Sequence, residues 1–402
     1  MKAVLVVIDG LGIGEMPDVA SARPQDRGAN TLASIVRRAG PLPLGTLRLL
    51  GLGEIAPLGP SAAPACGALA SYGRSQLAHP GADSYLGHQE IVGTIPEAPV
   101  RTLVSQVADL LEKGLVSSGH TVRRPRTGKG LLIVDEALAI GDNLEADPGM
   151  NINVTVATDR IRFEEALKVG RMVRECVTVS RVIVFGGPGI GVKEILQHVQ
   201  ERPNGQIGVD SPSLGVYNEN LQVTHMGYGV DPERQAPSLL VHQGVEVVLI
   251  GKMADLITCP GAKRDPAVPT PQVMQSVLDS CLSAQDAFIA ATVQETDLAA
   301  HEGDALRMAH VLEQVDEGLR TLLSEIRTED VLVICADHGN DPAVNVGLHT
   351  REETPLLIYQ KGQTGRSLGV RKTLADIGAT VTHLFGAPST QDGSIIEFRR
   401  SE

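Results

Sequence analysis

The chain of 402 residues contains no tryptophan, and aromatic side chains make up only 2% of it. Surfaces that bind single-stranded nucleic acid stack bases on aromatic rings, and few rings are available here. Positive charge is in the minority, with 35 Lys and Arg against 48 Asp and Glu and a formal net charge of −13. Because a phosphate backbone is bound by a basic stripe, the composition argues against a nucleic-acid partner.

Paired cysteines and long apolar runs are missing as well. The five cysteines form no CxxC pair, which argues against a disulfide framework and against a structural zinc knuckle. The first apolar run, residues 3–8, is too short for a signal peptide or a membrane span, and no later run approaches that length. We therefore expect a cytoplasmic protein without a membrane partner.

Apolar residues are present in ordinary proportion, 42%, which is enough for one large core or two smaller ones. Short β-branched runs recur and suit the strands of a parallel sheet that is buried on both faces. These runs lie at residues 4–8, 131–134, 182–185, 247–250, 288–293, 331–334 and 355–358. Amphipathic stretches separate them, most clearly at residues 305–326, where apolar side chains recur at helical spacing. The sequence therefore predicts the α/β class.

Two breaks in the pattern indicate how the chain is divided into domains. Residues 227–237 are rich in glycine, proline and polar side chains, as segments between domains often are. A second candidate boundary lies at residues 96–99. We therefore predict that residues 98–228 form an inserted unit and that residues 1–97 and 229–402 form the larger sheet around it.

Acidic and imidazole side chains follow two of the predicted strands. Asp9 ends the first strand, and Asp337 and His338 follow the strand at 331–334, with His349 a short way further on. Because the carboxyl ends of parallel strands meet at one crevice of a sheet, these side chains are expected to lie close together.

A third strand leads into Asp297 and His301, which are four residues apart and share one face if the stretch is helical. The six residues together offer three carboxylates and three imidazoles, enough for two divalent ions with open positions for substrate. Any one of them alone is more commonly a helix cap or an ion-pair partner. Oxygen and nitrogen ligands without thiolate favour Mn²⁺ or Zn²⁺ over Ca²⁺, and imidazole suits Mg²⁺ poorly.

Ser84 is the best candidate for a nucleophile beside such ions, because it lies in a loop rich in polar residues. By its local sequence alone, a turn serine is the commoner interpretation. Ser84 does not lie in a GxSxG pattern, so a serine-hydrolase triad built on it is not supported. Gly10, Gly12 and Gly14 follow the first strand but fail the GxGxxG spacing, because Glu15 stands at the last position, which argues against a dinucleotide site.

These motifs resemble those of the phosphopentomutases, two-metal phosphotransfer enzymes of the alkaline-phosphatase superfamily that are related to cofactor-independent phosphoglycerate mutase. The segments that carry the resemblance are 9–18 (DGLGIGEMPD), 28–32 (GANTL), 50–53 (LGLG), 71–74 (SYGR), 87–90 (GHQE), 251–255 (GKMAD), 336–339 (ADHG) and 349–352 (HTRE). The first and the last of them are specific rather than generic. The resemblance runs through most of both segments of the predicted larger sheet.

The resemblance implies an alkaline-phosphatase-like core, with a central mainly parallel sheet flanked by helices, and a smaller α/β cap domain inserted after the nucleophile loop. It also implies two Mn²⁺ ions. The ligands implied are Asp297, His301 and His349 for one ion, and Asp9, Asp337 and His338 for the ion beside the nucleophile.

Further site residues follow from the same resemblance. Ser84 stands where the family has its phosphorylated threonine, and Asp135 matches an aspartate that contacts the substrate. Arg74, Lys252 and Arg351 lie in or beside the motifs and are candidates for binding a phosphorylated substrate.

The chain also departs from the family pattern. Ala82 replaces a lysine and Gln89 a tryptophan around the nucleophile, and the loop from Asp297 to His301 is one residue shorter. Residues 184–188, VFGGP, stand where the family has arginines that hold the distal phosphate of the substrate.

We therefore predict a phosphopentomutase-like isomerase that moves a phosphoryl group between the C1 and C5 oxygens of a small phosphorylated sugar through a phosphoserine at Ser84. A metal-dependent phosphatase, or another phosphotransferase on the same core, is the alternative, because it would share every metal ligand and differ only in the cap. A metal-containing binding or scaffold protein is a third interpretation, against which the nucleophile argues. The oligomeric state stays open.

Overall fold

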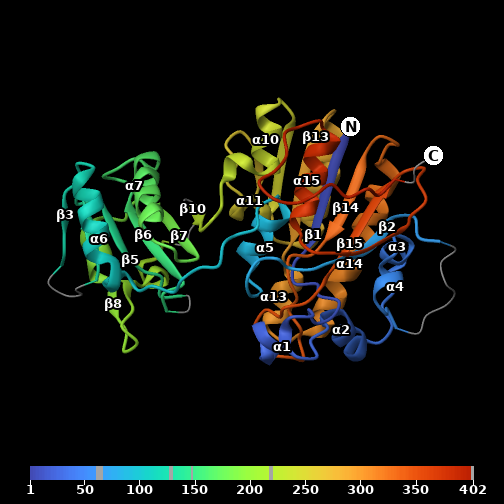
Figure 1. The fold of residues 1–402 in the computed structure, drawn as a ribbon, viewed down its shortest axis with the longest axis horizontal. Coiled ribbons are helices and arrows are strands. Elements are labelled where there is room, and N and C mark those ends of the chain that lie inside the picture. Colours follow the sequence, from blue (N-terminus) through green and yellow to red (C-terminus); the bar gives the residue numbers. More distant parts are fainter. Residues whose placement is uncertain (60–66, 126–129, 146–147, 217–220, 400–402) are drawn as a thin grey trace. The chain divides into compact units, whose positions relative to one another are not determined.

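The computed structural model describes residues 1–59, 67–125, 130–145, 148–216 and 221–399. Its contacts divide the chain into two compact units (Figure 1). The core unit combines Met1–Pro96 with Asp231–Glu402, and the inserted unit is Glu97–Val230. The roles of catalytic core and cap remain predictions, since compactness alone assigns no role.

An eight-stranded sheet forms the centre of the core unit, in the order β12-β11-β13-β1-β14-β15-β2-β16. Its strands are β1 (Lys2–Ile8), β2 (Ser71–Ser75), β11 (Glu246–Gly251), β12 (Lys263–Asp265), β13 (Ala287–Val293), β14 (Val331–Cys335), β15 (Thr354–Gln360) and β16 (Ser367–Arg371). The five strands from β12 to β14 run parallel, whereas β15 is antiparallel to β14 and to β2, and β2 is parallel to β16. The predicted α/β class with a mainly parallel central sheet is confirmed.

Helices cover both faces of this sheet, because alternate residues of β1 enter two different apolar clusters. Val4, Val6 and Ile8 pack with α2, α3, α12 and α14, and the residues between them pack with α5, α10, α11 and α15. The helices of the core unit are α1 (Val19–Ala22), η1 (Pro24–Asp26), α2 (Thr31–Ala39), α3 (Gly45–Leu49), α4 (Leu52–Ile55), α5 (Ser84–Ile91), η2 (Pro232–Arg234), α10 (Ala236–His242), α11 (Lys252–Leu256), α12 (Thr270–Ser283), α13 (Glu295–His301), α14 (Ala305–Glu325) and α15 (Ala375–Leu384).

The inserted unit has its own sheet of six strands, in the order β10-β7-β6-β5-β4-β3, in which only β6 and β7 are parallel to each other. Its elements are α6 (Val104–Ser117), β3 (Val122–Arg123), β4 (Leu132–Val134), β5 (Leu138–Asp142), β6 (Asn151–Ala157), α7 (Phe163–Cys176), β7 (Arg181–Gly187), α8 (Val192–Gln197), β8 (Val199–Glu201), β9 (Ile207–Val209), α9 (Ser211–Leu214) and β10 (Gln222–Gly227). Helices α6 and α7 pack on one face, while α8 and the β8–β9 pair lie with the apolar cluster of the other.

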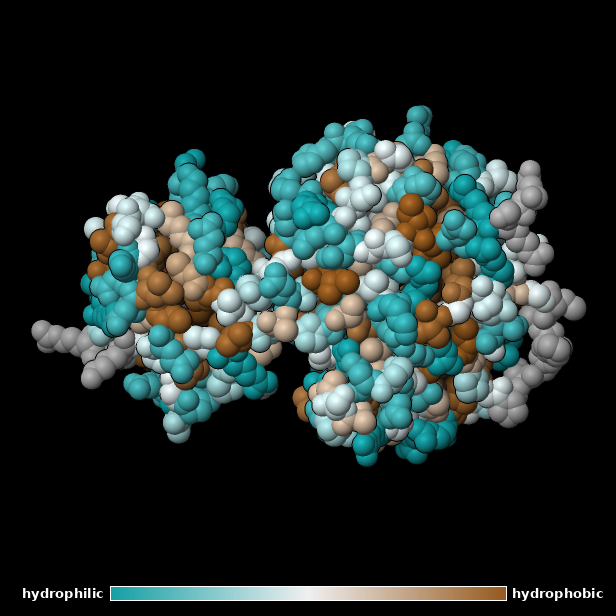
Figure 2. Space-filling model, viewed as in Figure 1, coloured by the Kyte–Doolittle hydropathy of each residue, from teal (hydrophilic) through white to brown (hydrophobic). Residues whose placement is uncertain are grey.

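The surface mixes hydrophilic and hydrophobic residues (Figure 2), and the described cysteines are unpaired. On the face shown in Figure 2, hydrophilic residues are interspersed with small hydrophobic patches on both units. Within the described residues, no helix is both long and apolar enough to cross a membrane. Cys176, Cys259, Cys281 and Cys335 are free thiols, and Cys66 lies outside the described residues.

Candidate active site

Three neighbouring parallel strands end side by side at one edge of the core sheet. The register pairs Ile8 of β1 with Val293 of β13, and Val7 with Cys335 of β14. Each strand end is followed closely by an aspartate, namely Asp9, Asp297 and Asp337. The side chains therefore converge because the strands that precede them are in register.

The structure brings all six predicted metal ligands together at this edge. Within the described residues, three groups offer ligand atoms that lie within 4.8 Å of one another. They are Asp297, His301 and His349; Asp9, Asp297 and His338; and Asp9, His88 and Asp337. The first group is one of the two trios implied above. Of the other implied trio, His338 Nε2 lies 3.1 Å from Asp337 and 3.5 Å from Asp9.

The three predicted imidazoles are turned alike. Nδ1 of His301 contacts the carbonyl oxygen of Gly347 at 2.8 Å, and His338 and His349 contact backbone carbonyls in the same way at 3.0 and 2.8 Å. Because a carbonyl oxygen only accepts, each Nδ1 carries a proton, and Nε2 is the ring nitrogen that faces the carboxylates. That is the arrangement a metal-binding imidazole requires.

Three buried ligand atoms of the cluster have no hydrogen-bond partner and face only charged neighbours, namely both carboxylate oxygens of Asp9 and Nε2 of His338. Both side chains are fully buried, and orphaned polar atoms at such depth are costly unless an ion or water satisfies them. The donor set, the tautomers and these orphaned atoms fit divalent cations.

Burial and neighbouring charges shift the pKa values of the ionisable groups in this pocket. Burial, with the negative charge of Asp337 nearby, raises the pKa of Asp9 to about 7. The pKa of Asp337 is held well below its usual range, since the positive charges of His338 and His88 outweigh the effect of burial. Asp337 in turn raises the pKa of His338 to about 10 against the opposing effect of burial. The pocket therefore favours added positive charge.

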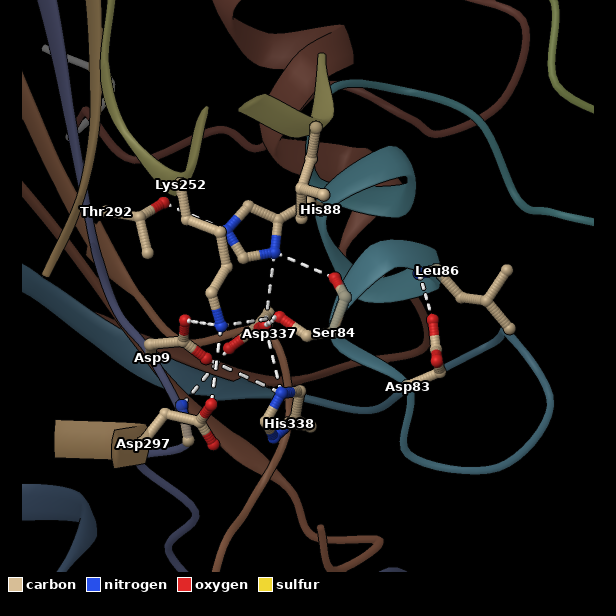
Figure 3. A network of polar contacts seen from close by, with 12 residues as sticks. Asp9, Asp83, Ser84, Leu86, His88, Lys252, Thr292, Asp297, Asp337 and His338 are labelled. Atoms are coloured by element: carbon tan, nitrogen blue, oxygen red, sulfur yellow. Dashed lines mark hydrogen bonds and ion pairs between the residues drawn. The ribbon is translucent and has the colours of Figure 1, made fainter. Parts of the chain in front are cut away.

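Lys252, the first residue of α11, supplies one such charge. Its Nζ lies 2.5 Å from Asp9 Oδ2 and 3.3 Å from Asp297 Oδ2, and it also donates to Ser84 Oγ at 3.3 Å (Figure 3). Burial opposes its charge, but the carboxylates of Asp9, Asp297 and Asp337 prevail and raise the pKa of Lys252.

Ser84 stands at the first position of α5, which Asp83 caps by accepting a hydrogen bond from the Leu86 amide at 3.0 Å. The Ser84 hydroxyl donates to Asp337 Oδ2 at 2.8 Å. The helix comes this close because Gly87 has no side chain: a Cβ there would lie 2.6 Å from the Asp337 carbonyl oxygen. The hydroxyl thus lies at a helix N-terminus, which favours negative charge.

His88 was not singled out by the sequence analysis. Its Nδ1 lies 2.8 Å from the Ser84 carbonyl oxygen and 3.1 Å from Asp337 Oδ2, and its Nε2 lies 2.9 Å from Thr292 Oγ1. The carbonyl contact requires a proton on Nδ1, so His88 donates to Asp337 rather than ligating an ion through that atom. Its spacing of four residues from Ser84 on a helix was the available signal.

Asn340 was also missed, although it stands two residues after the predicted ligand pair Asp337 and His338 in sequence. Its side-chain amide donates to Asp297 Oδ1 at 2.8 Å and is fully buried. Asn340 therefore orients a carboxylate that lies in two of the three candidate groups.

The other predicted residues have different surroundings. Arg74 pairs with Glu353 at 3.2 Å and donates to the Ile55 carbonyl. Arg351 is buried against Asp18. Asp135 lies in the inserted unit, at the β4–β5 turn with a positive φ of 52°, where it accepts a hydrogen bond from the Thr121 amide at 2.8 Å.

Known proteins resemble the chain over nearly its whole length. A family model described as the metalloenzyme superfamily matches residues 1–389. A phosphopentomutase of Symbiobacterium thermophilum is 31% identical, covering 98% of this chain and 96% of its own. A phosphopentomutase of Caldanaerobacter subterraneus is 28% identical over the same shares. A solved phosphoglycerate mutase of Leishmania mexicana is 13% identical with a TM-score of 0.43, covering 98% of this chain and 96% of that one.

The fold and its carboxylate–imidazole centre thus define an enzyme of the metalloenzyme superfamily. Within that superfamily, the chain belongs to the phosphopentomutase family. The predicted resemblance and the prediction of a phosphopentomutase-like isomerase are confirmed by these relatives.

Proposed function

We propose that this enzyme moves a phosphoryl group between the C1 and C5 oxygens of a pentose phosphate through a phosphoserine at Ser84. The observation that carries the proposal is the place of the Ser84 hydroxyl, 2.8 Å from Asp337 Oδ2 and 3.3 Å from Lys252 Nζ, within the cluster of candidate metal ligands. The family to which the chain belongs supports a metal-dependent phosphosugar mutase. The phosphoserine at Ser84 and the pentose as substrate are what we propose.

We assign two divalent cations, Mn²⁺ in first place and Zn²⁺ in second, to the predicted trios. Asp297, His301 and His349 would hold one, and Asp9, Asp337 and His338 the other. When bound, the cations would favour ionisation of the serine hydroxyl and neutralise charge on the transferring group.

The residues around Ser84 prepare it for attack. Asp337 Oδ2 accepts the hydrogen bond of the Ser84 hydroxyl, so the lone pairs of Oγ point away from Asp337. The ammonium of Lys252 and the N-terminus of α5 favour negative charge on that oxygen and on the phosphoserine that follows. His88 fixes Asp337 from the other side. The Ser84 Oγ–phosphorus bond forms as the bond from phosphorus to the donor oxygen breaks; the serine proton passes towards Asp337, and the donor oxygen leaves as a hydroxyl after taking up a proton. The phosphoserine then gives its phosphoryl group to a hydroxyl of the sugar phosphate, and the other phosphoryl group of the resulting bisphosphate returns to Ser84, which completes the isomerisation.

Hydrolysis of a phosphate ester on the same core is the second candidate. It is favoured by the end of β7, where Phe185-Gly186-Gly187 stands instead of the arginines of the family pattern. A phosphatase would use the same serine and the same ligands but admit water to the phosphoserine. We propose a cytoplasmic location for the protein, whichever of the two activities it has.

A substrate screen separates the two candidates. The Mn²⁺-loaded protein is incubated with pentose and hexose 1-phosphates and 5- or 6-phosphates, and both isomer and free phosphate are measured. A mutase gives isomer without stoichiometric phosphate release, and intact-mass spectrometry then shows one added phosphate that Ser84→Ala abolishes. Ser84→Thr is the matched variant that should keep transfer, since it retains a hydroxyl. Turnover that survives Ser84→Ala would refute the phosphoserine.

A further inference from the structure

The segment that leads into Ser84 is irregular and partly buried. Residues 77–82, which we call the strap, connect the end of β2 to Asp83 and α5 without belonging to a helix or strand. Leu77, His79 and Ala82 are buried. Backbone groups that are withdrawn from water outside a helix or strand need other partners, and in the strap these partners are charged side chains.

Arg351 binds the carbonyl side of the strap. Its Nη2 donates to the Leu77 carbonyl at 2.9 Å, and its Nη1 donates to the carbonyls of His79 at 2.9 Å and Gly81 at 2.6 Å. Nε and Nη2 donate to Asp18, each at 2.9 Å. These partners use all five N–H donors of a guanidinium whose residue is only 5% exposed.

Glu90 binds the amide side of the same strap. Its carboxylate accepts from the Ala78 amide at 3.0 Å and the His79 amide at 2.9 Å, and contacts His79 Nδ1 at 2.6 Å. Glu90 is fully buried and lies in α5, the helix that Ser84 begins. The strap is therefore held between a buried cation and a buried anion, the second of which moves with the nucleophile helix.

His349 ties the end of the strap to the candidate metal ligands. Its Nδ1 donates to the Ala82 carbonyl at 2.8 Å, while its Nε2 lies 3.4 Å from Asp297 Oδ1. One ring thus contacts both the strap and the ligand cluster, and Arg351 follows it by two residues on the same segment.

We propose that Arg351 and Glu90 are positioning residues that clamp the strap and so hold Ser84 Oγ in place against Asp337, in contrast to the substrate-binding role predicted for Arg351. The inference rests on the proposed phosphoryl transfer at Ser84. A displacement of the nucleophile by about 1 Å costs roughly 100-fold in rate, even when its cause is remote from the chemistry.

The test compares Arg351→Lys with the wild type. Lysine keeps the charge but lacks the planar fork that spans three carbonyls and a carboxylate. We expect kcat to fall about 100-fold while KM for the sugar phosphate and the affinity for Mn²⁺ stay within about twofold. In the substrate-free protein, hydrogen exchange at the strap amides should accelerate about tenfold. A raised KM with unchanged kcat would instead make Arg351 a substrate ligand.

Two further variants distinguish a loss of the clamp from a general loss of stability. Glu90→Gln disturbs the opposite side of the strap and should give the same drop in kcat and the same faster exchange. Arg327→Lys is the matched control, because Arg327 pairs with Asp330 at 3.1 Å before β14, at the opposite strand end from Asp337. It should leave kcat and strap exchange unchanged.

The readouts separate the clamp from the proposed function. An active wild type whose variants keep wild-type strap exchange would overturn the clamp alone. A wild type that transfers no phosphoryl group would overturn the proposed function and the positioning role with it.

Discussion

The two proposed metal trios differ in how far they reach the solvent. Asp9, Asp337 and His338 are fully buried, with side chains 0% exposed. In the other trio Asp297 is 4% exposed, whereas His349 and His301 rise to 21% and 39%. The buried trio adjoins Ser84 through Asp337 and is surrounded by fixed donors. The outer trio is open to the solvent through its two histidines. We call Asp9, Asp337 and His338 the fixed half of the cluster, and Asp297, His301 and His349 the accessible half.

The largest effect should come from the fixed half. Asp337→Asn removes the acceptor of the Ser84 proton and the negative charge that His88 and His338 face, so we expect transfer to fall on the order of 10³-fold or more. Steady-state rates across a range of Mn²⁺ concentrations measure it. Because Asp337 is buried, excess metal should not restore activity, and restoration would contradict the difference between the halves.

Lys252→Met tests how strongly the pocket needs positive charge. Without metal, the variant leaves three buried carboxylates facing an uncharged side chain, and we expect the free energy of unfolding to drop by about 3 kcal/mol. Urea denaturation with a chelator and with Mn²⁺ measures the change. The deficit should shrink when Mn²⁺ is present, since the cation then supplies the missing charge. If the loss in the free energy of unfolding were the same with the chelator and with Mn²⁺, Lys252 would not act by balancing the charge of the metal pocket.

The accessible half should respond more mildly. His301→Ala removes one imidazole from the outer trio, and we expect the affinity for one of two metal ions to weaken by about 100-fold. Metal titration followed by activity measures this, and excess Mn²⁺ should recover most of the rate. His310→Ala is the matched control, because His310 is an exposed histidine of α14. A loss that excess metal cannot recover would place His301 in the fixed half.

The smallest effect concerns Glu352, which lies behind the cluster and accepts hydrogen bonds from Thr31 and Thr350. Burial raises the pKa of Glu352 to about 7. Because the folded state keeps this proton after the unfolded state has lost it, the group's contribution to stability falls as pH rises from about 4.5 to 7.

Glu352→Gln should remove that slope. Relative to the variant, the wild type should lose about 2 kcal/mol between pH 5 and pH 8, as measured by urea denaturation at each pH. The comparison uses the slope alone, since glutamine also changes the hydrogen bonds of Thr31. Parallel curves for the two proteins would show that Glu352 ionises normally.

Much of the cluster was predictable because its residues follow strands. Asp9, Asp297 and Asp337 each come after an apolar run, and the rule that parallel strands end at one edge is enough to bring them together. The resemblance then added how the six ligands are divided between two ions, which spacing alone left open. Their assignment to ions is still a prediction.

The missed residues depend on packing that no local pattern contains. His88 reaches Asp337 only because α5 packs against the Asp337 loop, and that approach depends on Gly87. Arg351 was singled out for its charge, but its partners come from Asp18 and from the strap, more than two hundred and fifty residues away in sequence. A charge is visible in the sequence, whereas the groups that neutralise it are not.

By itself, the sequence determined the α/β class, the carboxylates at the strand ends and the family, because these depend on local periodicity and on short motifs. Only the tertiary structure decided which imidazole nitrogen faces the carboxylates, which cation touches Ser84 and what holds the strap. Those features arise where buried polar groups must find partners across the whole chain, and the fold selects the partners.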